Sequence, residues 1–544
     1  MSEFQENEKI TEPEVAEETK EVKEEYHDEL DQFTSIFADP EAHNDKPKQN
    51  GKRRIISIIA AFLAVAVLVG GTIAVIKLIP ELEDDEAQSS VFEDIKVVDV
   101  DSDKLSTVTV KNSKGEFKFY SVTSESTEGE SSDTSSDKSE NAVSWLLDGV
   151  EMDKTSSSEI NSIISSAATV TAMREIETKT AAECGLDMPV IKVDVQSDEI
   201  EGYSILVGSA SPDGTGTYLK TSTSDKIYLV DDGAFSSFEF EALDLANTSS
   251  FAAATFTNTT GYMSDDGKLA SFDELTVSGK NFGDTVKIGP SDTDEKLQSL
   301  VSFEVVEPMR RFANDENVSA AFKLFTDNLA VAGAYSYDID DKSLAAVGLD
   351  NPDLIVSLTV GGETKTFKIA YVDDEYCAVI NDSSIMIRKV ARSNIAFAGA
   401  TSESFYSTWV IMQMINDVKN MTVTVDDTDY SFDITYDDAE GAEEPYVIMH
   451  GDKKLDDENF RDFYQIFVGF TANSFKTVEV GEVSTTVKLT LTDKSVRTLE
   501  FYKISDTAYQ YHVDGKALGT VTSSAYNKFV KNLKLVAEDK KVAQ

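Results

Sequence analysis

The chain has 544 residues, of which 99 are acidic and 49 are basic, so its formal net charge is −50. This excess of acid excludes nucleic acid and anionic lipid surfaces as partners held by charge, because both would be repelled. An acidic surface that only keeps the protein soluble is the alternative reading of the same charge. Two cysteines, Cys184 and Cys377, are too few for a disulfide framework in a chain of this length. We expect both to be small buried hydrophobes, with a single bridge between them as the alternative.

Residues 1–51 are dominated by Glu, Asp and Lys and contain few large apolar residues. Such a segment cannot bury enough surface to offset its conformational entropy, so we predict a disordered acidic tail. One apolar patch interrupts it, formed by Leu30, Phe33, Ile36 and Phe37 at helical spacing. The patch is a candidate docking site that folds on a partner, and a chance apolar cluster in a tail explains it equally well.

The longest apolar run in the chain extends from Ile55 to Ile79 and carries no charge before Lys77. A helix rises about 1.5 Å per residue, so roughly twenty apolar residues span the ~30 Å hydrocarbon core of a bilayer. The run therefore predicts a transmembrane helix within residues 52–79, and a buried core helix is the alternative. No small-x-small cleavage site follows the run, which favours a signal anchor over a cleaved signal peptide.

The charges on either side of this run predict its orientation. Basic residues, among them Lys52, Arg53 and Arg54, precede it, whereas the linker at 80–91 is acidic. Because basic residues are retained on the cytoplasmic side, we expect a cytoplasmic N-terminus and an extracytoplasmic C-terminal region. The predicted localisation is the cell membrane, crossed once.

Three segments of the remaining chain share one helical pattern, at 157–167, 315–325 and 457–467. In each, apolar residues recur at i, i+3, i+4 and i+7, and polar residues suited to capping a helix stand at the start. The apolar positions are Ile160, Ile163, Ile164 and Ala167; Val318, Ala321, Phe322 and Phe325; and Phe460, Phe463, Tyr464 and Phe467. The pattern predicts one amphipathic helix used three times against a sheet, and Tyr526, Phe529, Val530 and Leu533 predict a further closing helix.

Strands and turns repeat as well. Residues 105–110 resemble 421–425, where Val alternates with a polar residue in the period-two pattern of a strand buried on one face. Gly-Leu-Asp-x-Pro occurs at 185–189 and again at 348–352, each time before an alternating strand. Gly and Pro at fixed offsets indicate a turn with a backbone role, with a binding loop as the alternative.

These patterns together predict an α+β fold: a single N-terminal transmembrane helix followed by three tandem modules of antiparallel sheet plus packed helix. The predicted modules cover 92–247, 248–402 and 418–540. A Ser-, Thr- and acid-rich stretch at 121–140 is expected to be a disordered insert in the first module.

The sequence offers no constellation for catalysis, cofactor or metal. His450 and His512 have no neighbouring ligands at metal-binding spacing. Asp99 to Asp103 imitates the start of a calcium loop but lacks its Gly and its closing Glu. The glycine-rich stretch 208–216 does not open a helix, so it predicts a hairpin loop and not a phosphate cradle. We expect no enzyme, no cofactor and no metal site.

A set of turns and strands recurs around the predicted helices. It consists of Trp145-Leu-Leu-Asp-Gly149, the Gly-Leu-Asp-x-Pro turn, Ile205-Leu-Val-Gly208, Pro212, Gly214, Tyr218-Leu219 and Ile227-Tyr-Leu-Val230. The set resembles the family known as domain of unknown function 4340. The resemblance implies an envelope protein, often linked with ABC transporters of the gliding-motility auxiliary type, and it implies no catalytic residues.

Two functions are therefore expected. The favoured one is a membrane-anchored extracytoplasmic accessory or interaction protein, associated with an ABC transport system and without chemistry of its own. The alternative is a free-standing envelope scaffold or adhesion protein. The expected partners are the lipid bilayer through Ile55–Ile79, ABC transporter subunits, and a cell-wall polymer or envelope protein. An extracytoplasmic hydrolase is a more distant third.

Overall fold

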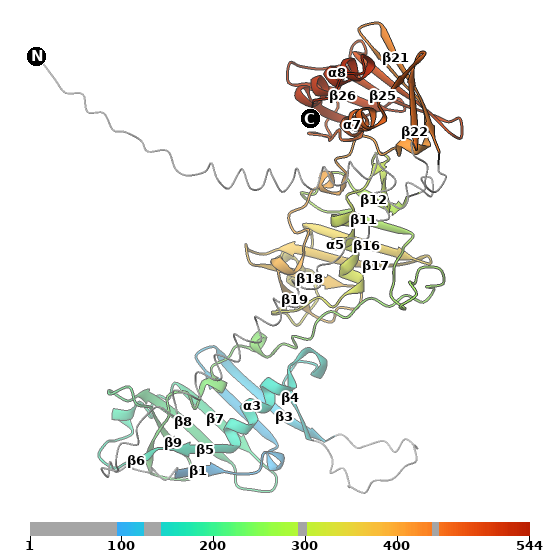
Figure 1. Cartoon of the computed structure of the whole chain (residues 1–544). Coiled ribbons are helices and arrows are strands. Elements are labelled where there is room, and N and C mark those ends of the chain that lie inside the picture. Colours follow the sequence, from blue (N-terminus) through green and yellow to red (C-terminus); the bar gives the residue numbers. More distant parts are fainter. Residues whose placement is uncertain (1–94, 124–142, 292–301, 438–444, 544) are drawn as a thin grey trace, which may run out of the picture. The chain divides into compact units, whose positions relative to one another are not determined.

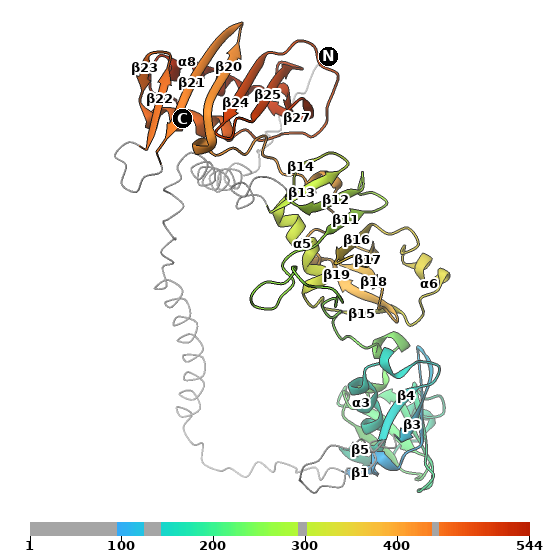
Figure 2. The same ribbon diagram turned by 90° about the vertical axis from the view of Figure 1, so that its right-hand side faces the viewer.

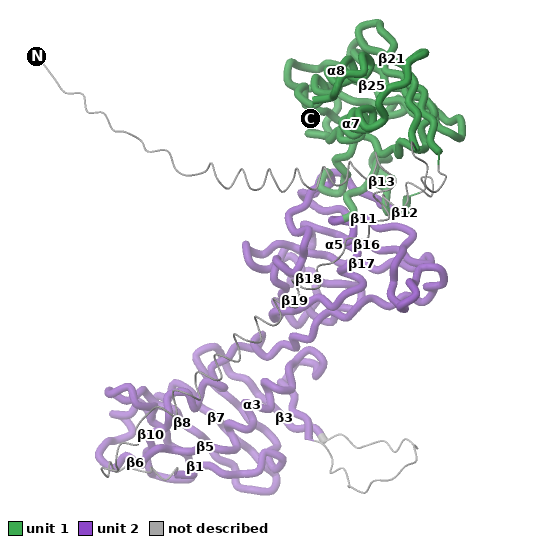
Figure 3. Tube along the Cα trace, viewed as in Figure 1, with its two compact units in different colours: residues 1–81, 290–315, 403–544 green, residues 82–289, 316–402 purple. Residues whose placement is uncertain are grey.

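In a computed structural model of the chain, the structure describes residues 95–123, 143–291, 302–437 and 445–543. The described residues divide into two compact units, coloured separately in Figure 3. Unit 1 contains those between 290 and 315 and those from 403 onward, whereas unit 2 contains those up to 289 and those between 316 and 402. This division into two units does not test the three predicted modules, whose boundaries stay a prediction.

The first sheet of unit 2 has eight antiparallel strands in the order β4-β3-β2-β7-β8-β9-β10-β6 (Figure 1). Its strands are β2 (Thr107–Asn112), β3 (Gly115–Thr123), β4 (Val143–Leu147), β6 (Arg174–Ile176), β7 (Ile191–Gln196), β8 (Tyr203–Ala210), β9 (Thr217–Thr221) and β10 (Ile227–Val230). A two-stranded sheet joins β1 (Ile95–Asp99) to β5 (Thr169–Ala172). The helix α3 (Ser157–Ala168) begins where the Ser156 side chain accepts from the Glu159 N–H, and its apolar stripe is buried. Most of the predicted insert, from residue 124 onward, lies outside the described residues.

In the second sheet, which has nine strands, those that belong to unit 2 follow one another in the order β12-β11-β16-β17-β18-β19-β15. Figure 2 shows β16, β17, β18 and β19 side by side, with α5 beside them. The strands are β11 (Glu274–Ser278), β12 (Val286–Pro290), β15 (Gly333–Ser336), β16 (Leu354–Val360), β17 (Glu363–Tyr371), β18 (Tyr376–Asn381) and β19 (Ile387–Ala391). The helices are α5 (Asp315–Thr326) and α6 (Asp341–Ala346). The ring of Phe325 on α5 packs edge-on against Phe367 of β17, with centroids 5.2 Å apart.

The repeated Gly-Leu-Asp-x-Pro turn has a backbone role. Gly185 and Gly348 both adopt left-handed conformations, with φ of 71° and 81°, which residues with a Cβ rarely adopt. Each glycine follows a short helical segment, and the leucine after it is buried. The turn reverses the chain and seats this leucine in the core before the next strand begins. The prediction of a structural turn is confirmed.

The main sheet of unit 1 has eight antiparallel strands in the order β23-β22-β21-β20-β24-β25-β26-β27. They are β20 (Val418–Val425), β21 (Thr428–Tyr436), β22 (Tyr446–His450), β23 (Lys453–Leu455), β24 (Thr485–Leu491), β25 (Val496–Lys503), β26 (Ala508–Val513) and β27 (Lys516–Thr522). Unit 1 also contains β13 (Phe303–Glu307) and β14 (Arg311–Phe312), which pair as an antiparallel hairpin. The helices α7 (Asp457–Val468) and α8 (Ser523–Ala537) form at the two segments whose apolar spacing predicts them.

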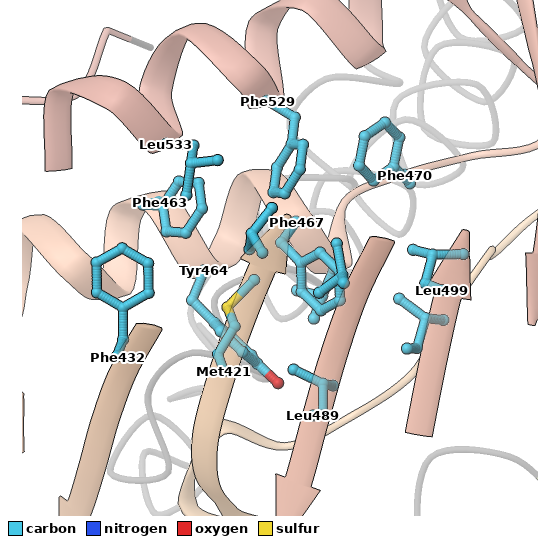
Figure 4. Close-up of a cluster of buried hydrophobic side chains, with 14 of the residues drawn as sticks. Met421, Phe432, Phe463, Tyr464, Phe467, Phe470, Leu489, Leu499, Phe529 and Leu533 are labelled. Atoms are coloured by element: carbon cyan, nitrogen blue, oxygen red, sulfur yellow. The ribbon is translucent and has the colours of Figure 1, made fainter. Parts of the chain in front are cut away.

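The core of unit 1 is a cluster of aromatic and aliphatic side chains between these two helices and the sheet (Figure 4). The ring of Phe529 on α8 lies 5.5 Å from the rings of both Phe463 and Phe470 and 6.0 Å from that of Phe467, measured between centroids. These separations lie in the range that favours offset and edge-to-face aromatic packing. The cluster therefore joins α7, α8 and the sheet into one body.

The predicted fold class is wrong as a whole. The described part of the chain is mostly antiparallel sheet with five α-helices, and it forms several sheet domains instead of an N-terminal helix followed by helix-packed modules. The physical reason is that period-two alternation continues through most segments between the helices, so backbone hydrogen bonds between strands organise the chain.

The predicted membrane localisation is corrected as well. Within the residues that the structure describes, no helix combines the length and the apolar character needed to cross a membrane. The run from Ile55 to Ile79, on which the prediction was based, lies outside those residues.

Candidate anion-binding pocket

A cavity of about 280 Å³ lies within unit 1. Its walls come from the β13–β14 hairpin, the segment 407–410, and the strands β25, β26 and β27 with their connecting turn. The lining residues are Glu304, Arg310, Arg311, Phe312, Ser407, Trp409, Val410, Arg497, Tyr511, Val513, Asp514, Lys516 and Leu518. The cavity thus combines charged and apolar groups that are far apart in the sequence.

Backbone hydrogen bonds fix the hairpin that carries Arg310, Arg311 and Phe312. The Ser407 N–H donates to the Phe312 carbonyl at 2.9 Å, and the Asn314 N–H donates to the Phe405 carbonyl at 2.9 Å. Because these bonds join the hairpin to the segment that precedes β20, the side chain of Arg311 is held against β27.

Arg311 is the most unusual side chain in the pocket. Its guanidinium carbon lies 4.3 Å from the ring centroid of Tyr406 and 5.2 Å from that of Phe475, distances at which a cation is attracted to an aromatic face. Its Nη1 donates to the Leu518 carbonyl at 3.2 Å. Its Nε is buried without a hydrogen-bond partner, and no carboxylate in the described part of the chain forms an ion pair with it.

Burial lowers the pKa of Arg311 from its ordinary value, because the charged form is partly removed from water. An arginine nevertheless keeps its proton in proteins, since its pKa starts far above neutrality. The pocket therefore contains a partly buried positive charge that no acidic side chain offsets by direct contact.

The two carboxylates in the pocket are each paired with another arginine. Glu304, whose side chain is only 5% exposed, accepts from Arg310 Nε at 2.7 Å and from Ser291 Oγ at 3.0 Å. Asp514 accepts from Arg497 Nε at 2.9 Å. The lining holds four basic and two acidic side chains, so it is electropositive in a chain whose net charge is −50.

The rest of the lining is apolar or neutral. Trp409, Phe312 and Val410 come from the hairpin side, and Tyr511, Val513 and Leu518 from the sheet side. Burial raises the pKa of Tyr511 to about 12, so its phenol stays neutral at physiological pH. An electropositive wall beside apolar rings suits a ligand with an anionic head and an apolar body.

The residues singled out in the sequence lie elsewhere. The candidate docking residues Leu30, Phe33, Ile36 and Phe37 fall outside the described residues, so they stay a prediction. His450 Nδ1 contacts the Ser431 carbonyl at 2.8 Å, and His512 Nε2 lies 3.0 Å from Gln510 Nε2. No cluster of His, Cys, Asp and Glu within the described ranges could hold a metal ion.

The calcium-like and glycine-rich segments are occupied by local contacts. Asp99 pairs with Lys96, and the Asp101 side chain accepts from the Asp103 N–H at 3.1 Å. The stretch 208–216 contains the end of β8 and the hairpin loop that leads from it to β9. Within it, Ser211 and Thr215 donate to Asp213 and lower the pKa of that carboxyl to about 2.

Both cysteines are free and buried in unit 2, which confirms the prediction that they act as small hydrophobes. Burial raises the pKa of the Cys377 thiol to about 11 and also raises that of Cys184. Neither thiol is therefore poised as a nucleophile at neutral pH.

Reasoning from the sequence missed the pocket, although one signal was present. Arg310 and Arg311 are adjacent arginines followed by an aromatic residue, in a chain with twice as many acidic as basic residues. Their partners across the cavity, on β25 to β27, follow about two hundred residues later, as in the Arg311–Leu518 contact. No local pattern reveals such a pairing.

The described fold places this chain among proteins built from successive antiparallel sheets with few helices and with a basic, partly aromatic pocket. Residues 145–352 match the family model described as domain of unknown function (DUF4340), which confirms the family resemblance of this part of the chain. The match includes the hairpin residues of the pocket but ends before its other walls. No curated protein and no solved structure matches the chain.

Proposed function

We propose that this protein is an interaction protein without chemistry of its own, which holds an anionic group of its partner in the pocket of unit 1. The observation that carries the proposal is Arg311: its charge is partly buried, its guanidinium lies against two aromatic rings, and it has no ion pair with a described carboxylate. A buried charge is costly unless it is paired, so a partner that supplies the missing anion gains affinity there.

The other ionisable groups of the pocket favour binding over catalysis. Glu304 and Asp514 are each engaged by an arginine. The pKa of Tyr511 is raised to about 12, so its phenol keeps its proton at neutral pH. A general acid or base works best when its pKa lies near the operating pH and its proton is free to move. Groups that are locked into ion pairs position a ligand and do not transfer its protons.

The favoured partner is a component of an ABC transport system, and the alternative is a role as a free-standing scaffold or adhesion protein. The family resemblance favours the first. Deleting residues 26–37, which hold the apolar patch around Phe33, distinguishes the two, because only the transport role should lose its partner.

The test is crosslinking and co-purification of the full chain from native cells, with Arg311→Met and Arg392→Met compared. Arg392 is a matched control, since its guanidinium also lies 4.3 Å from a tyrosine ring, that of Tyr371, but it has Asp374 as an ion-pair partner. We expect R311M to lose the partner and R392M to retain it. If both variants retain the partner, the pocket does not take part in the interaction.

A further inference from the structure

We infer that the group bound in the pocket is a monoanionic carboxylate joined to an apolar body of about one side chain in size. This inference rests on the proposed function and adds the chemistry of the ligand. The supporting observations are the charge balance of the walls, the donors that Arg311 leaves unused, and the cavity volume.

The charge balance favours a single negative charge. Arg310 and Arg497 are already engaged by Glu304 and Asp514, so Arg311 and Lys516 supply the charge that is left. Glu403 acts on Arg311 electrostatically without forming an ion pair with it, which reduces this remaining charge further. Lys516 is exposed and remains largely solvated. A dianion such as a phosphate monoester would bring its second charge toward the two carboxylates of the wall, and like charges in a partly buried site repel each other strongly.

The geometry of Arg311 favours a planar acceptor. Its Nη1 is used by the Leu518 carbonyl, and its Nε is buried. Its Nη2 meets the Met309 sulfur at 3.5 Å, and a thioether is a weak acceptor. A carboxylate oxygen is a far stronger acceptor for that N–H, and the flat guanidinium, already oriented by Tyr406 and Phe475, matches the flat carboxylate.

The volume and the apolar lining define the body of the ligand. The cavity measures about 280 Å³, just below the roughly 300–1,000 Å³ found for small-molecule sites. Such a space holds one aromatic or branched apolar group, against Trp409 and Val513, together with the carboxylate that it carries. The carboxylate can belong to a free small acid or to the C-terminus of a peptide, and the chemistry recognised is the same.

The two tryptophans of the chain make this inference measurable. Trp145→Phe leaves Trp409, a residue of the pocket wall, as the single fluorescent reporter in the full-length protein. The probes are N-acetylphenylalanine, its neutral amide and phenyl phosphate, together with a peptide ending in phenylalanine as the free acid or as the amide. We expect saturable changes in Trp409 fluorescence with the two carboxylates, and at least tenfold weaker binding of both amides and of phenyl phosphate.

Three variants in the W145F background test the roles of the side chains. Arg311→Lys keeps a charge but loses the flat guanidinium that Tyr406 and Phe475 orient, and we expect about a tenfold loss of affinity for N-acetylphenylalanine. Lys516→Gln, an exposed change that does not threaten folding, should weaken binding a few-fold. Arg392→Met, outside the pocket, should bind as the parent does.

The outcomes separate the ligand class from the function. If phenyl phosphate or the amides bind as tightly as the carboxylates, and R311K weakens them, the pocket binds but the carboxylate assignment is wrong. If no probe binds but R311M still loses the cellular partner, the carboxylate assignment is wrong and the proposed function is supported. If no probe binds and R311M keeps the partner, both the carboxylate assignment and the proposed function are wrong. Binding of the peptide acid but not of the small acid assigns the carboxylate to a partner protein.

Discussion

The side-chain amide of Gln510 pairs with both backbone groups of Val478. The Val478 N–H donates to Gln510 Oε1 at 2.7 Å, and Gln510 Nε2 donates to the Val478 carbonyl at 3.1 Å. Gln510 stands on β26 and is 1% exposed, whereas Val478 lies in the irregular segment between α7 and β24. The buried amide thus makes the two backbone hydrogen bonds that a neighbouring strand would make. These bonds hold the segment against the sheet of unit 1.

Gln510→Leu should release this segment. The substitution leaves the N–H and carbonyl of Val478 without protein partners, and we expect the free energy of unfolding of unit 1 to fall by about 1–3 kcal/mol. Hydrogen exchange at the Val478 amide should accelerate more than exchange in β24. Gln196→Leu, at an exposed position in unit 2, is the control and should change neither quantity. Unchanged protection at Val478 would contradict the anchoring role.

Asn532 should hold the C-terminal segment in the same way. Its side chain is fully buried, donates to the Ala543 carbonyl at 3.1 Å and accepts from the Ala543 N–H at 2.7 Å. Asn532→Ala should raise the exchange rate of the Ala543 amide and speed digestion by a carboxypeptidase, with a loss of about 1–3 kcal/mol in stability. Asn527→Ala, an exposed position on the same helix, serves as the matched control, and equal digestion of the two variants would argue against the clamp.

Phe529→Ala should be among the most destabilising changes in unit 1. The ring is fully buried and contacts the rings of Phe463, Phe467 and Phe470. Removing it leaves a cavity at the junction of both helices and the sheet, with an expected cost of about 3–5 kcal/mol in urea unfolding. Val530→Ala, at the neighbouring half-buried position, should cost clearly less. Similar costs for the two variants would show that the aromatic cluster is not the centre of this core.

Glu363 should make the stability of unit 2 depend on acid pH. Lys365 and the N–H and hydroxyl of Thr257 all contact its carboxylate and lower its pKa from 4.5 to about 2. A carboxyl whose pKa is lower in the folded state stabilises the fold above its unfolded pKa, and this contribution disappears as the pH falls from about 4.5 toward 2. Glu363→Gln should therefore lower the melting temperature at pH 7, with a difference that narrows below pH 4.5. A constant difference across this range would rule out the ionised carboxylate as its source.

The two thiols should be unreactive in the folded protein. Cys184 and Cys377 are fully buried, and the pKa of Cys377 is raised to about 11. At pH 8 we expect Ellman's reagent to modify neither thiol in the native chain and both in urea. Rapid modification of the native chain would show that unit 2 opens locally at these strands.

Helices and turns could be predicted from the sequence because their determinants are local. The spacing of Phe460, Phe463 and Phe467 defines one face of a helix without reference to the rest of the chain, and α7 forms there. Gly348 could be predicted as a turn because a left-handed φ favours glycine. The apolar run at 55–79 is equally local, but the membrane helix inferred from it finds no counterpart in the described residues.

The dominance of the sheets and the pocket could not be predicted in this way, because both depend on pairing between distant segments. Besides its hairpin neighbour β3, β2 pairs with the distant β7, with Val108 opposite Val195, and nothing near either strand specifies that second neighbour. The pocket depends on a still longer separation, since Arg311 and Leu518 are 207 positions apart.

The sequence by itself determined the acidic character of the chain, the positions of its main amphipathic helices and the turns that repeat around glycine, because each follows from spacing within a few residues. Only the tertiary structure decided which strands pair and where positive charge gathers. Adjacent arginines in an acidic chain become a site only when the fold buries one of them between Tyr406 and Phe475 and engages the local carboxylates elsewhere.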